Sequence, residues 1–361
     1  MWKTKLTEKL GIQFPIIQAP MAGGATSVEL IAAVSNAGGL GSLGAGYMTP
    51  DEIRKTIKKI RELTSNPFAV NLFIPEKYFV TTHLLQKACD VINRSCIELN
   101  MEIKPIREPY AQSFEDQINI LIEEKIPVFS YTFGTLSPEW VKLLKINNTF
   151  LIGTATTLEE ALILEGTGAD MIVAQGSEAG GHRGTFLDRA EDALMGLFSL
   201  IPQLVNKTKI PIIAAGGIMN GTGLIAAIDL GADGVQMGTA FLSTLEAGIP
   251  HAYKQLLLNL KQDNTVLTRA FSGKLARGIR NKFTEHMNDK IENILDYPIQ
   301  NKLTNSMRKK AKETNNIDFM SLWAGQAATL CRNIPAGELV KTLIYEAEEL
   351  NLCGKLRIFK S

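Results

Sequence analysis

Short apolar runs alternate with amphipathic helical stretches over the first two thirds of the chain. Eight of the runs have the length and composition of strands, at 16–19, 39–43, 68–72, 128–131, 150–153, 171–174, 210–214 and 234–237. Most are apolar throughout instead of alternating with polar residues. This pattern is typical of parallel strands that are buried on both faces.

Helical periodicity fills the connections, at 27–36, 50–63, 113–124, 138–144, 158–165, 193–205 and 220–230. Helix starts carry recognisable signals: Thr49 precedes Pro50, and Thr157 followed three residues later by Glu160 predicts a capping box. Eight successive strand-then-helix units predict an α/β fold, a closed (β/α)8 TIM barrel with its chemistry at the carboxyl ends of the strands. A doubly wound open sheet is the competing fold, but it rarely needs eight parallel units.

Two regions interrupt the alternation. Residues 75–109 are long for a strand-to-helix connection and include helical periodicity at 83–99. From Gly248 onward there is no clear strand, only helical runs such as 250–261 and 337–350. We therefore assign 1–74 and 110–247, with 323–361 packing back, to the barrel. We assign 75–109 and 248–322 to an added helical lobe over the barrel mouth, where it would exclude water and shape a substrate pocket.

Composition narrows the classes of partner. The chain has 361 residues, of which 45% are hydrophobic, enough for a large barrel and a lobe. A net charge of +1 gives no electrostatic reason to expect nucleic acid or a membrane surface as partner. The basic residues Arg308, Lys309, Lys310 and Lys312 are interpreted as a solvated helix face.

The N-terminal segment and the cysteines indicate a compartment. The first ten residues lack the apolar core of a signal peptide, and no apolar run reaches the roughly 18 residues that span a bilayer. Cys89 and Cys96 lie seven residues apart, which predicts buried thiols on one helix face. We expect a soluble, cytoplasmic protein, and a homodimer is the assembly to test.

Glycine-rich segments follow several strands. Gly216-Gly217 and Gly238-Thr239 come after the seventh and eighth predicted strands. In a barrel, backbone amides at these two places form a phosphate site, so the spacing predicts a phosphate-bearing cofactor. No Gly-x-Gly-x-x-Gly with a following acidic residue opens a first helix, so a dinucleotide-binding Rossmann site is not expected. The four histidines lack a paired spacing for a metal.

A histidine follows paired glycines after the sixth predicted strand. The segment reads Gln175-Gly-Ser-Glu-Ala-Gly-Gly-His-Arg183, and it contains Gly180, Gly181 and His182. Glycines allow the backbone to turn with positive φ and to approach a ligand closely. A histidine in such a loop can handle a proton near neutral pH, although it can also be polar filler in a solvent loop.

These segments together resemble the nitronate monooxygenase family, formerly called 2-nitropropane dioxygenases. The matching pieces are Gln18-Ala-Pro-Met21, Pro67-Phe-Ala-Val-Asn71, Gln175 to Gly184, Ala215-Gly-Gly-Ile218, Gly234-Val-Gln-Met-Gly-Thr239, Tyr297 to Thr304 and Leu322-Trp-Ala-Gly-Gln326. The resemblance implies a barrel that binds FMN without a covalent bond. It also implies oxidation of small nitronates by O2 to a carbonyl compound and nitrite.

The resemblance also implies roles for individual residues. His182 matches the family's active-site histidine, either binding the anionic nitro oxygens or acting as a base on neutral nitroalkanes. Tyr297 and Lys302 match a tail motif near the substrate pocket. The positions implied to contact the cofactor are Met21, Asn71, Gln175, Gly180, Gly181, Gly216, Gly217, Gln236, Met237, Gly238 and Thr239.

Other functions stay open at this stage. Barrel enoyl-acyl-carrier-protein reductases and some quinone reductases share the Glu178-to-His182 core and consume NAD(P)H, so a flavin reductase is the nearest alternative. A non-catalytic binding module on the same scaffold is a second. An IMP-dehydrogenase-like barrel is disfavoured because no cysteine occupies a loop after a mid-chain strand.

Overall fold

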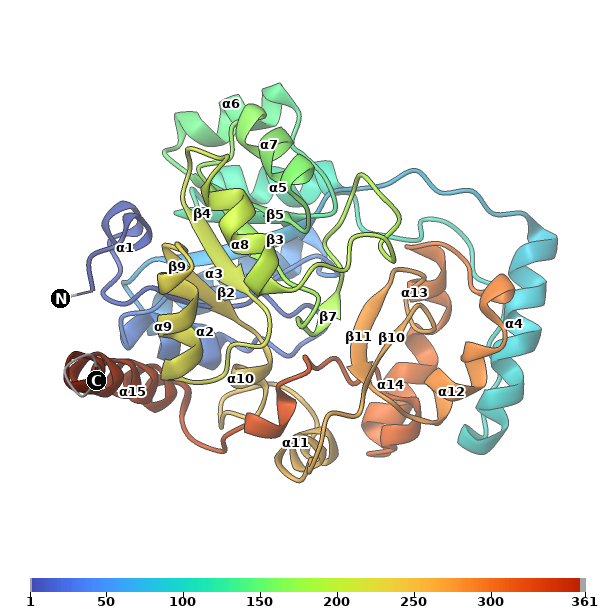
Figure 1. Cartoon of the computed structure of the whole chain (residues 1–361). Coiled ribbons are helices and arrows are strands. Elements are labelled where there is room, and N and C mark those ends of the chain that lie inside the picture. The colour runs from blue at the N-terminus through green and yellow to red at the C-terminus, as the bar shows by residue number, and fades with distance from the viewer. Residues whose placement is uncertain (1, 358–361) are drawn as a thin grey trace.

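Eight parallel strands close into one barrel (Figure 1). The computed structural model describes the backbone of residues 2–357 and the side chains of residues 2–350. The barrel strands are β1 Ile16–Gln18, β2 Gly41–Gly44, β3 Phe68–Phe73, β4 Val128–Thr132, β5 Phe150–Ala155, β6 Met171–Gln175, β8 Ile212–Ala215 and β9 Gly234–Met237. All eight predicted strands are thus present.

Backbone hydrogen bonds close the ring of strands. The spatial order is β1-β9-β8-β6-β5-β4-β3-β2. Between the two end strands, the Leu40 amide donates to the Ile16 carbonyl, and the Gln18 amide donates to the Leu40 carbonyl, each over 2.9 Å. An open doubly wound sheet would leave these edges unpaired, so the predicted TIM barrel is confirmed.

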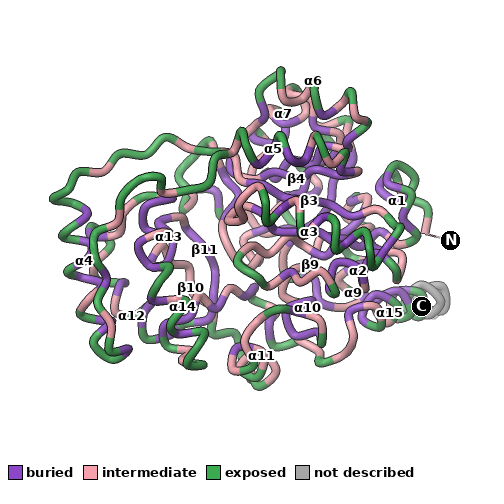
Figure 2. The backbone as a smooth tube through the Cα atoms, turned by 180° about the vertical axis from the view of Figure 1, so that it is seen from behind, coloured by how far each residue is buried: buried purple, intermediate pink, exposed green. Residues whose placement is uncertain are grey.

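Helices surround the strands (Figure 2). They are α2 Val28–Asn36, α3 Pro50–Leu63, α5 Phe114–Glu123, α6 Pro138–Ile146, α7 Leu158–Gly166, α8 Leu197–Val205, α9 Gly221–Asp229, α10 Thr239–Leu242 and α15 Ala336–Arg357. The helix start predicted at Thr49 is present and forms a capping box, with Glu52 accepting a hydrogen bond from the Thr49 amide. At α7 only half of the prediction holds. Thr157 accepts from the Glu160 amide, but the Glu160 carboxylate points elsewhere.

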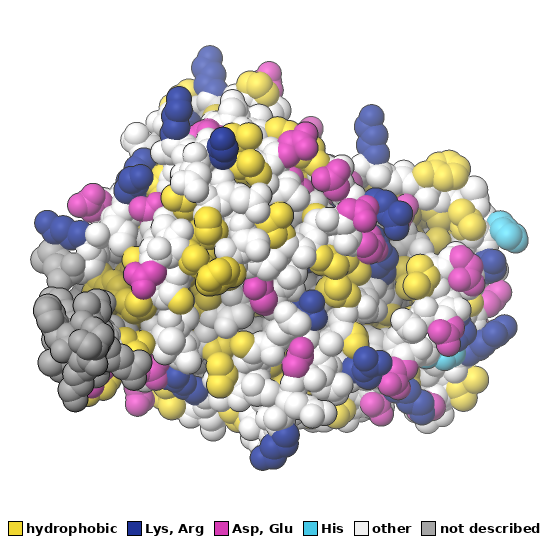
Figure 3. Space-filling view, in the orientation of Figure 1, with side chains coloured by type: hydrophobic (Ala, Val, Ile, Leu, Met, Phe, Trp, Pro, Cys, Tyr) yellow, Lys and Arg dark blue, Asp and Glu magenta, His cyan; other side chains and the backbone are white. Residues whose placement is uncertain are grey.

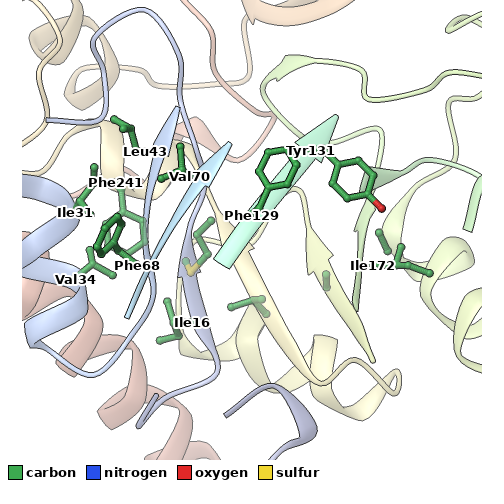
Figure 4. Packing of buried hydrophobic residues seen from close by; sticks show 14 of the residues in the cluster. Ile16, Ile31, Val34, Leu43, Phe68, Val70, Phe129, Tyr131, Ile172 and Phe241 are labelled. Carbon is green, nitrogen blue, oxygen red and sulfur yellow. The ribbon is translucent and has the colours of Figure 1, made fainter. Parts of the chain in front are cut away.

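Two layers of apolar side chains form the barrel core. The first lies between strands and helices, where Ile31 and Val34 of α2 pack near Phe68 (Figure 4). The second fills the barrel interior and is closed at its amino-terminal end by Leu6 and Leu10 of α1 Lys5–Leu10. The carboxyl ends of the strands are left as the open end of the barrel, where the site lies.

A second body of structure lies beside the barrel (Figure 1). It contains α4 Thr82–Cys96, η1 Ile97–Leu99, α11 His251–Leu258, α12 Lys282–Asn288, η2 Ile291–Asn293, α13 Ile299–Leu303, α14 Asn305–Glu313, η3 Ile317–Phe319 and, near α11, η4 Ala328–Leu330. A separate apolar cluster holds these helices together, and Cys89 and Cys96 are buried in it as predicted.

The prediction that no strand follows Gly248 was wrong. Strands β10 Thr265–Thr268 and β11 Ala276–Ile279 form an antiparallel hairpin, and β11 also pairs with β7 Gly181–His182. Each strand is only four residues long, and β10 is half-buried along its whole length. It therefore lacks the apolar run that marked the barrel strands. The proposed domain boundaries stay a prediction, and their residues 358–361 lie outside the described part of the chain.

The surface carries charges of both signs. On the face in Figure 3, acidic and basic side chains are interspersed, with single apolar side chains among them. Within residues 2–357, the helices fall short of the combined length and apolar character that crossing a bilayer requires.

Candidate active site

A pocket opens at the carboxyl ends of the barrel strands, beneath the lobe. We call it the central pocket. It brings together Met21, Asn71, Gln175, Gly180, Gly181, His182, Gly216, Gly217, Gln236, Met237, Gly238 and Thr239. Every cofactor-contacting residue expected from the sequence lines this pocket, together with His182. They come from the ends of five strands, β1, β3, β6, β8 and β9, or from the loops that follow them, because parallel strands present all their carboxyl ends at one rim.

His182 is held by both halves of the molecule. Its Nε2 lies 2.8 Å from the Ser272 hydroxyl in the turn between β10 and β11. The Trp323 ring packs against the imidazole with centroids 5.2 Å apart, and Phe133 packs edge-on at 6.1 Å. Burial, followed by the positive charges of Lys274 and Arg308, lowers the pKa of His182 to about 3. The ring is therefore neutral near pH 7.

Gln175 and Arg183 fix the loop that carries His182. The Gln175 amide nitrogen donates to the His182 carbonyl over 2.9 Å, and its oxygen accepts from the Gly184 amide over 2.8 Å. Buried Arg183 donates to the Gly176 carbonyl over 2.7 Å and to the Ala193 carbonyl over 2.8 Å. Burial lowers the pKa of Arg183 to about 10, so it stays charged at neutral pH. These contacts set the direction of the histidine.

Two backbone turns offer free hydrogen-bond donors. Gly216 and Gly217 have φ of 135° and 65°, a conformation that favours glycine. Among the described residues, the backbone amides of Gly216, Gly217, Gly238 and Thr239 have no acceptor. Half-buried amides, such as those of Gly216, Gly238 and Thr239, usually find a partner, so these three and the exposed Gly217 amide beside them fit an anionic ligand such as a phosphate.

Amide and hydroxyl side chains line the opposite strands. Asn71 is 3% exposed, and its amide nitrogen donates to the Ser130 hydroxyl over 3.0 Å. Its oxygen has no donor within the described chain. Thr132 and Thr154 follow on the next strands. Sequence reasoning missed Ser130, Thr132 and Thr154, although hydroxyls at the ends of otherwise apolar strands were a usable signal.

An aromatic wall stands beside His182. Phe133, Phe73 and Tyr297 have ring centroids 5.0 to 6.4 Å apart. Phe133 has φ of 76°, which is rare for a bulky residue and is found where the surroundings over-determine the backbone. Tyr297 stands behind the rings that line the pocket and does not itself line it. Its expected role in substrate binding stays a prediction, and its observed contacts are with this wall.

Lys302 does not reach the central pocket, which corrects its expected place. Its amine donates to the Pro109 carbonyl, at the end of the 75–109 segment. The reason is geometric: Lys302 lies on α13 on a side that faces this segment, while the pocket is reached from α14. The structure instead brings Arg308 and Lys312 of α14 to the pocket lining. The interpretation of this basic run as a solvated face was therefore wrong for Arg308, whereas Lys312 is exposed although it also lines the pocket.

Comparison with known proteins identifies the family. The sequence profile described as nitronate monooxygenase matches residues 3–346. The chain belongs to the nitronate monooxygenase family. It is 44% identical to a probable nitronate monooxygenase of Staphylococcus saprophyticus, over 96% of this chain and 98% of that one. A counterpart in Staphylococcus haemolyticus is 45% identical, over 97% and 99%.

Solved structures of relatives agree with this family. A nitroalkane oxidase from Streptomyces ansochromogenes superposes with a TM-score of 0.88 at 38% identity, over 96% of this chain and 99% of that one. FabK from Thermotoga maritima gives 0.76 at 30% identity, over 99% of both chains. As a member of the nitronate monooxygenase family, the chain is an oxidoreductase, and the central pocket is its candidate active site.

Proposed function

We propose that this protein is an FMN-dependent nitronate monooxygenase that oxidises small alkyl nitronates with O2 to carbonyl compounds and nitrite. The observation that carries the proposal is the placement of a neutral histidine in the central pocket, where six of the seven family-matching segments meet. The family match over residues 3–346 and the 38% identical nitroalkane oxidase support the same reaction class.

The residues present fit FMN. The four unpaired amides of Gly216, Gly217, Gly238 and Thr239 would hold its phosphate, as backbone donors after the last two strands of such barrels do. Asn71 retains its amide oxygen and Gln175 retains one N–H, and both can meet the ring or the ribityl hydroxyls. Met21 lies in the loop after β1 and would lie against the ring. When bound, FMN would accept electrons from the nitronate and return them to O2.

His182 acts as a neutral hydrogen-bonding group. Its Nε2 is engaged with Ser272, and Nδ1 has no partner among the described residues. A conjugate acid with a pKa of about 3 holds a proton poorly near neutral pH, so His182 is a weak base. The site therefore suits a nitronate that arrives already deprotonated better than a neutral nitroalkane. The aromatic wall and Trp323 would shield the reacting group from water.

The test is direct. The purified protein should be yellow and should release FMN on denaturation. With O2 it should form nitrite from propionate 3-nitronate or ethyl nitronate, and much less from nitroethane before it ionises. Protein that takes up no FMN, or holo-protein that forms no nitrite from either nitronate, contradicts the proposal.

A flavin reductase on the same barrel is the second candidate. The likeness to FabK over 99% of both chains and the shared Glu178-to-His182 segment favour it. Anaerobic mixing with NADH or NADPH separates the two. Rapid bleaching of the flavin by a nicotinamide, with no bleaching by nitronate, would establish the reductase instead.

A further inference from the structure

Arg308 occupies the central pocket with a charge that nothing in the described chain neutralises. Its Nη2 donates to the Asn301 carbonyl over 2.6 Å and to the Asn301 side-chain oxygen over 2.8 Å. Its Nε is buried without an acceptor. No carboxylate among the described residues pairs with it, whereas the other buried cation of the site, Lys274, donates to Glu76 over 2.6 Å. Asn301 thus orients the guanidinium and leaves one edge free.

The surroundings of Arg308 are uncharged or positive. Tyr47 and Tyr297 are close enough to interact with it electrostatically, and burial raises the pKa of both phenols, so they stay neutral. Lys312 lies one turn further along α14, lines the same pocket and donates to the Gly23 carbonyl over 3.0 Å. Its pKa is lowered by burial and by Arg308. This side of the pocket therefore has a surplus of positive charge.

A buried cation without a partner is costly, and a bound anion removes that cost. His182 cannot supply the positive charge for an anionic substrate because it is neutral at working pH. Arg308 lines the same pocket and affects the charge state of His182 electrostatically. We propose that Arg308 is the residue that binds the anionic oxygens of the substrate, with Lys312 as a second positive charge. This inference rests on the proposed function, since it deepens the account of that same site.

The phosphate of FMN is the other anion to consider. Its expected donors follow β8 and β9, whereas Tyr47, the neighbour of Arg308, follows β2. In the closed barrel, β1 and β9 separate β2 from β8. Arg308 also lies close enough to His182 and to Tyr297 of the aromatic wall to act on both electrostatically. These neighbours assign Arg308 to the substrate side of the pocket.

The experiment uses holo-protein with Arg308→Met, Arg308→Lys and the matched control Lys310→Met, whose side chain is exposed on the same helix. We expect Arg308→Met to raise KM for nitronates roughly 10- to 100-fold, the range of a charge-assisted hydrogen bond, with a smaller change in kcat. Arg308→Lys should recover part of this loss, and Lys310→Met should resemble the wild type.

Two substrates distinguish which oxygens are bound. Ethyl nitronate carries only the nitronate charge, and propionate 3-nitronate adds a carboxylate. A higher KM for both places the nitronate at Arg308, and a higher KM for the second alone places the carboxylate there. An unchanged KM for both in Arg308→Met, or an equal change in Lys310→Met, overturns the inference. Loss of FMN from Arg308→Met at unchanged melting temperature would assign Arg308 to the phosphate and also overturn it.

A binding measurement keeps this inference separate from the reaction. Nitrate, a planar oxyanion, should bind wild-type holo-protein and perturb its flavin absorbance, with at least tenfold weaker binding in Arg308→Met. If the wild type turns over no nitronate but shows this difference, the proposed reaction fails and the anion site stands. If nitrate binds both proteins equally, the anion site fails whatever the turnover shows.

Discussion

At the residue scale, the pKa of His182 depends on neighbours that are far from it in the sequence. Lys274 lies over the Phe133 ring, 4.4 Å from its centroid, and pairs with Glu76. Its charge is the second cause of the low pKa of His182, after burial and before Arg308. Burial and these two cations thus keep the imidazole neutral. The same cations attract an anion, so the pocket can bind a negatively charged substrate without a proton on His182.

Removing one of these cations should move the titration of His182. In Lys274→Met we expect its pKa to rise from about 3, because a nearby positive charge disfavours the imidazolium. The pKa should still stay below 6.5, since burial is the largest cause. NMR titration of the histidine rings measures this. His286, whose pKa is lowered by burial and by Lys290 and Arg94, is an internal control that should not move. An unmoved His182 would contradict the assigned role of Lys274.

The sequence alone was enough to predict that residues at the carboxyl ends of the strands belong to the site. His182, Asn71 and the glycine pairs follow apolar runs directly, and barrel geometry then brings them to one rim. Arg308 and Lys312 could not be placed in this way. Their spacing of four residues shows that they share a helix face, but not whether that face meets solvent or a pocket. Lys302 failed for the converse reason, because a motif position fixes a backbone place and not the direction of a side chain.

At the element scale, Glu160 joins the start of α7 to the loop after His182. Its carboxylate accepts from the Thr156 amide over 2.6 Å and from the Phe186 amide over 2.6 Å. The hydroxyls of Thr156 and Thr185 also donate to it. The side chain is fully buried. With the Leu187 amide, which donates over 3.3 Å, one carboxylate with only acceptor oxygens therefore satisfies five donors from two parts of the chain.

Glu160→Gln should be destabilising, because the new amide group is a donor facing donors. We expect a loss of about 1–3 kcal/mol in the free energy of unfolding, the cost of leaving buried polar groups unpaired. Urea unfolding of the apoprotein measures it. Glu159→Gln is the matched control, since that side chain is exposed and should change stability by less than about 0.5 kcal/mol. Equal stability of the two variants would contradict the role given to Glu160.

This network also explains a partial failure of prediction. The spacing of Thr157 and Glu160 correctly indicates where α7 begins. The sequence pattern cannot show that donors in residues 185–187, on a later loop, bind the Glu160 carboxylate in place of the Thr157 amide. A capping-box pattern considers only donors that are close in sequence. A buried carboxylate accepts hydrogen bonds from any nearby donors that water does not reach.

At the scale of the whole molecule, the segment 322–326, which we call the tail, returns to the central pocket and forms part of its lining. The Gln326 amide donates to the Glu178 carbonyl over 3.0 Å, and the Gly325 amide donates to the Thr239 hydroxyl over 3.0 Å. A methyl group on Gly180 would lie 2.5 Å from the Ala324 carbonyl carbon and the Gly325 nitrogen. The tail and the histidine loop are therefore in direct backbone contact, which only glycine allows.

Gly180→Ala should disrupt the contact between the histidine loop and the tail. Because both obstructing atoms are backbone, they cannot turn aside as a side chain can, and the 324–326 segment must shift away from Thr239. We expect FMN affinity to fall roughly tenfold, about 1.4 kcal/mol, when measured by flavin fluorescence. Gly166→Ala is the control, since its added methyl meets nothing within 4 Å. Wild-type affinity in Gly180→Ala would show that the tail does not support the cofactor site.

The sequence predicts the barrel better than the lobe for a physical reason. Barrel strands are buried on both faces and follow one another in regular units, so each strand carries its own signal. The lobe is assembled from segments such as 82–99 and 265–279, which meet only after long loops. Its hairpin is stabilised by pairing with β7 and not by its own apolar pattern.

The pairing of β7 with β11 also determines when, during synthesis and folding, the surroundings of His182 are completed. Ala276 lies opposite His182, 94 positions further along the chain. During synthesis the six barrel strands up to β6 emerge well before β11, and contacts between distant segments are the slow ones to form. The histidine therefore receives its Ser272 partner only after most of the barrel has emerged. A nascent or truncated chain that ends before residue 265 can build barrel strands, yet its His182 lacks the Ser272 partner, so activity should appear late and all at once.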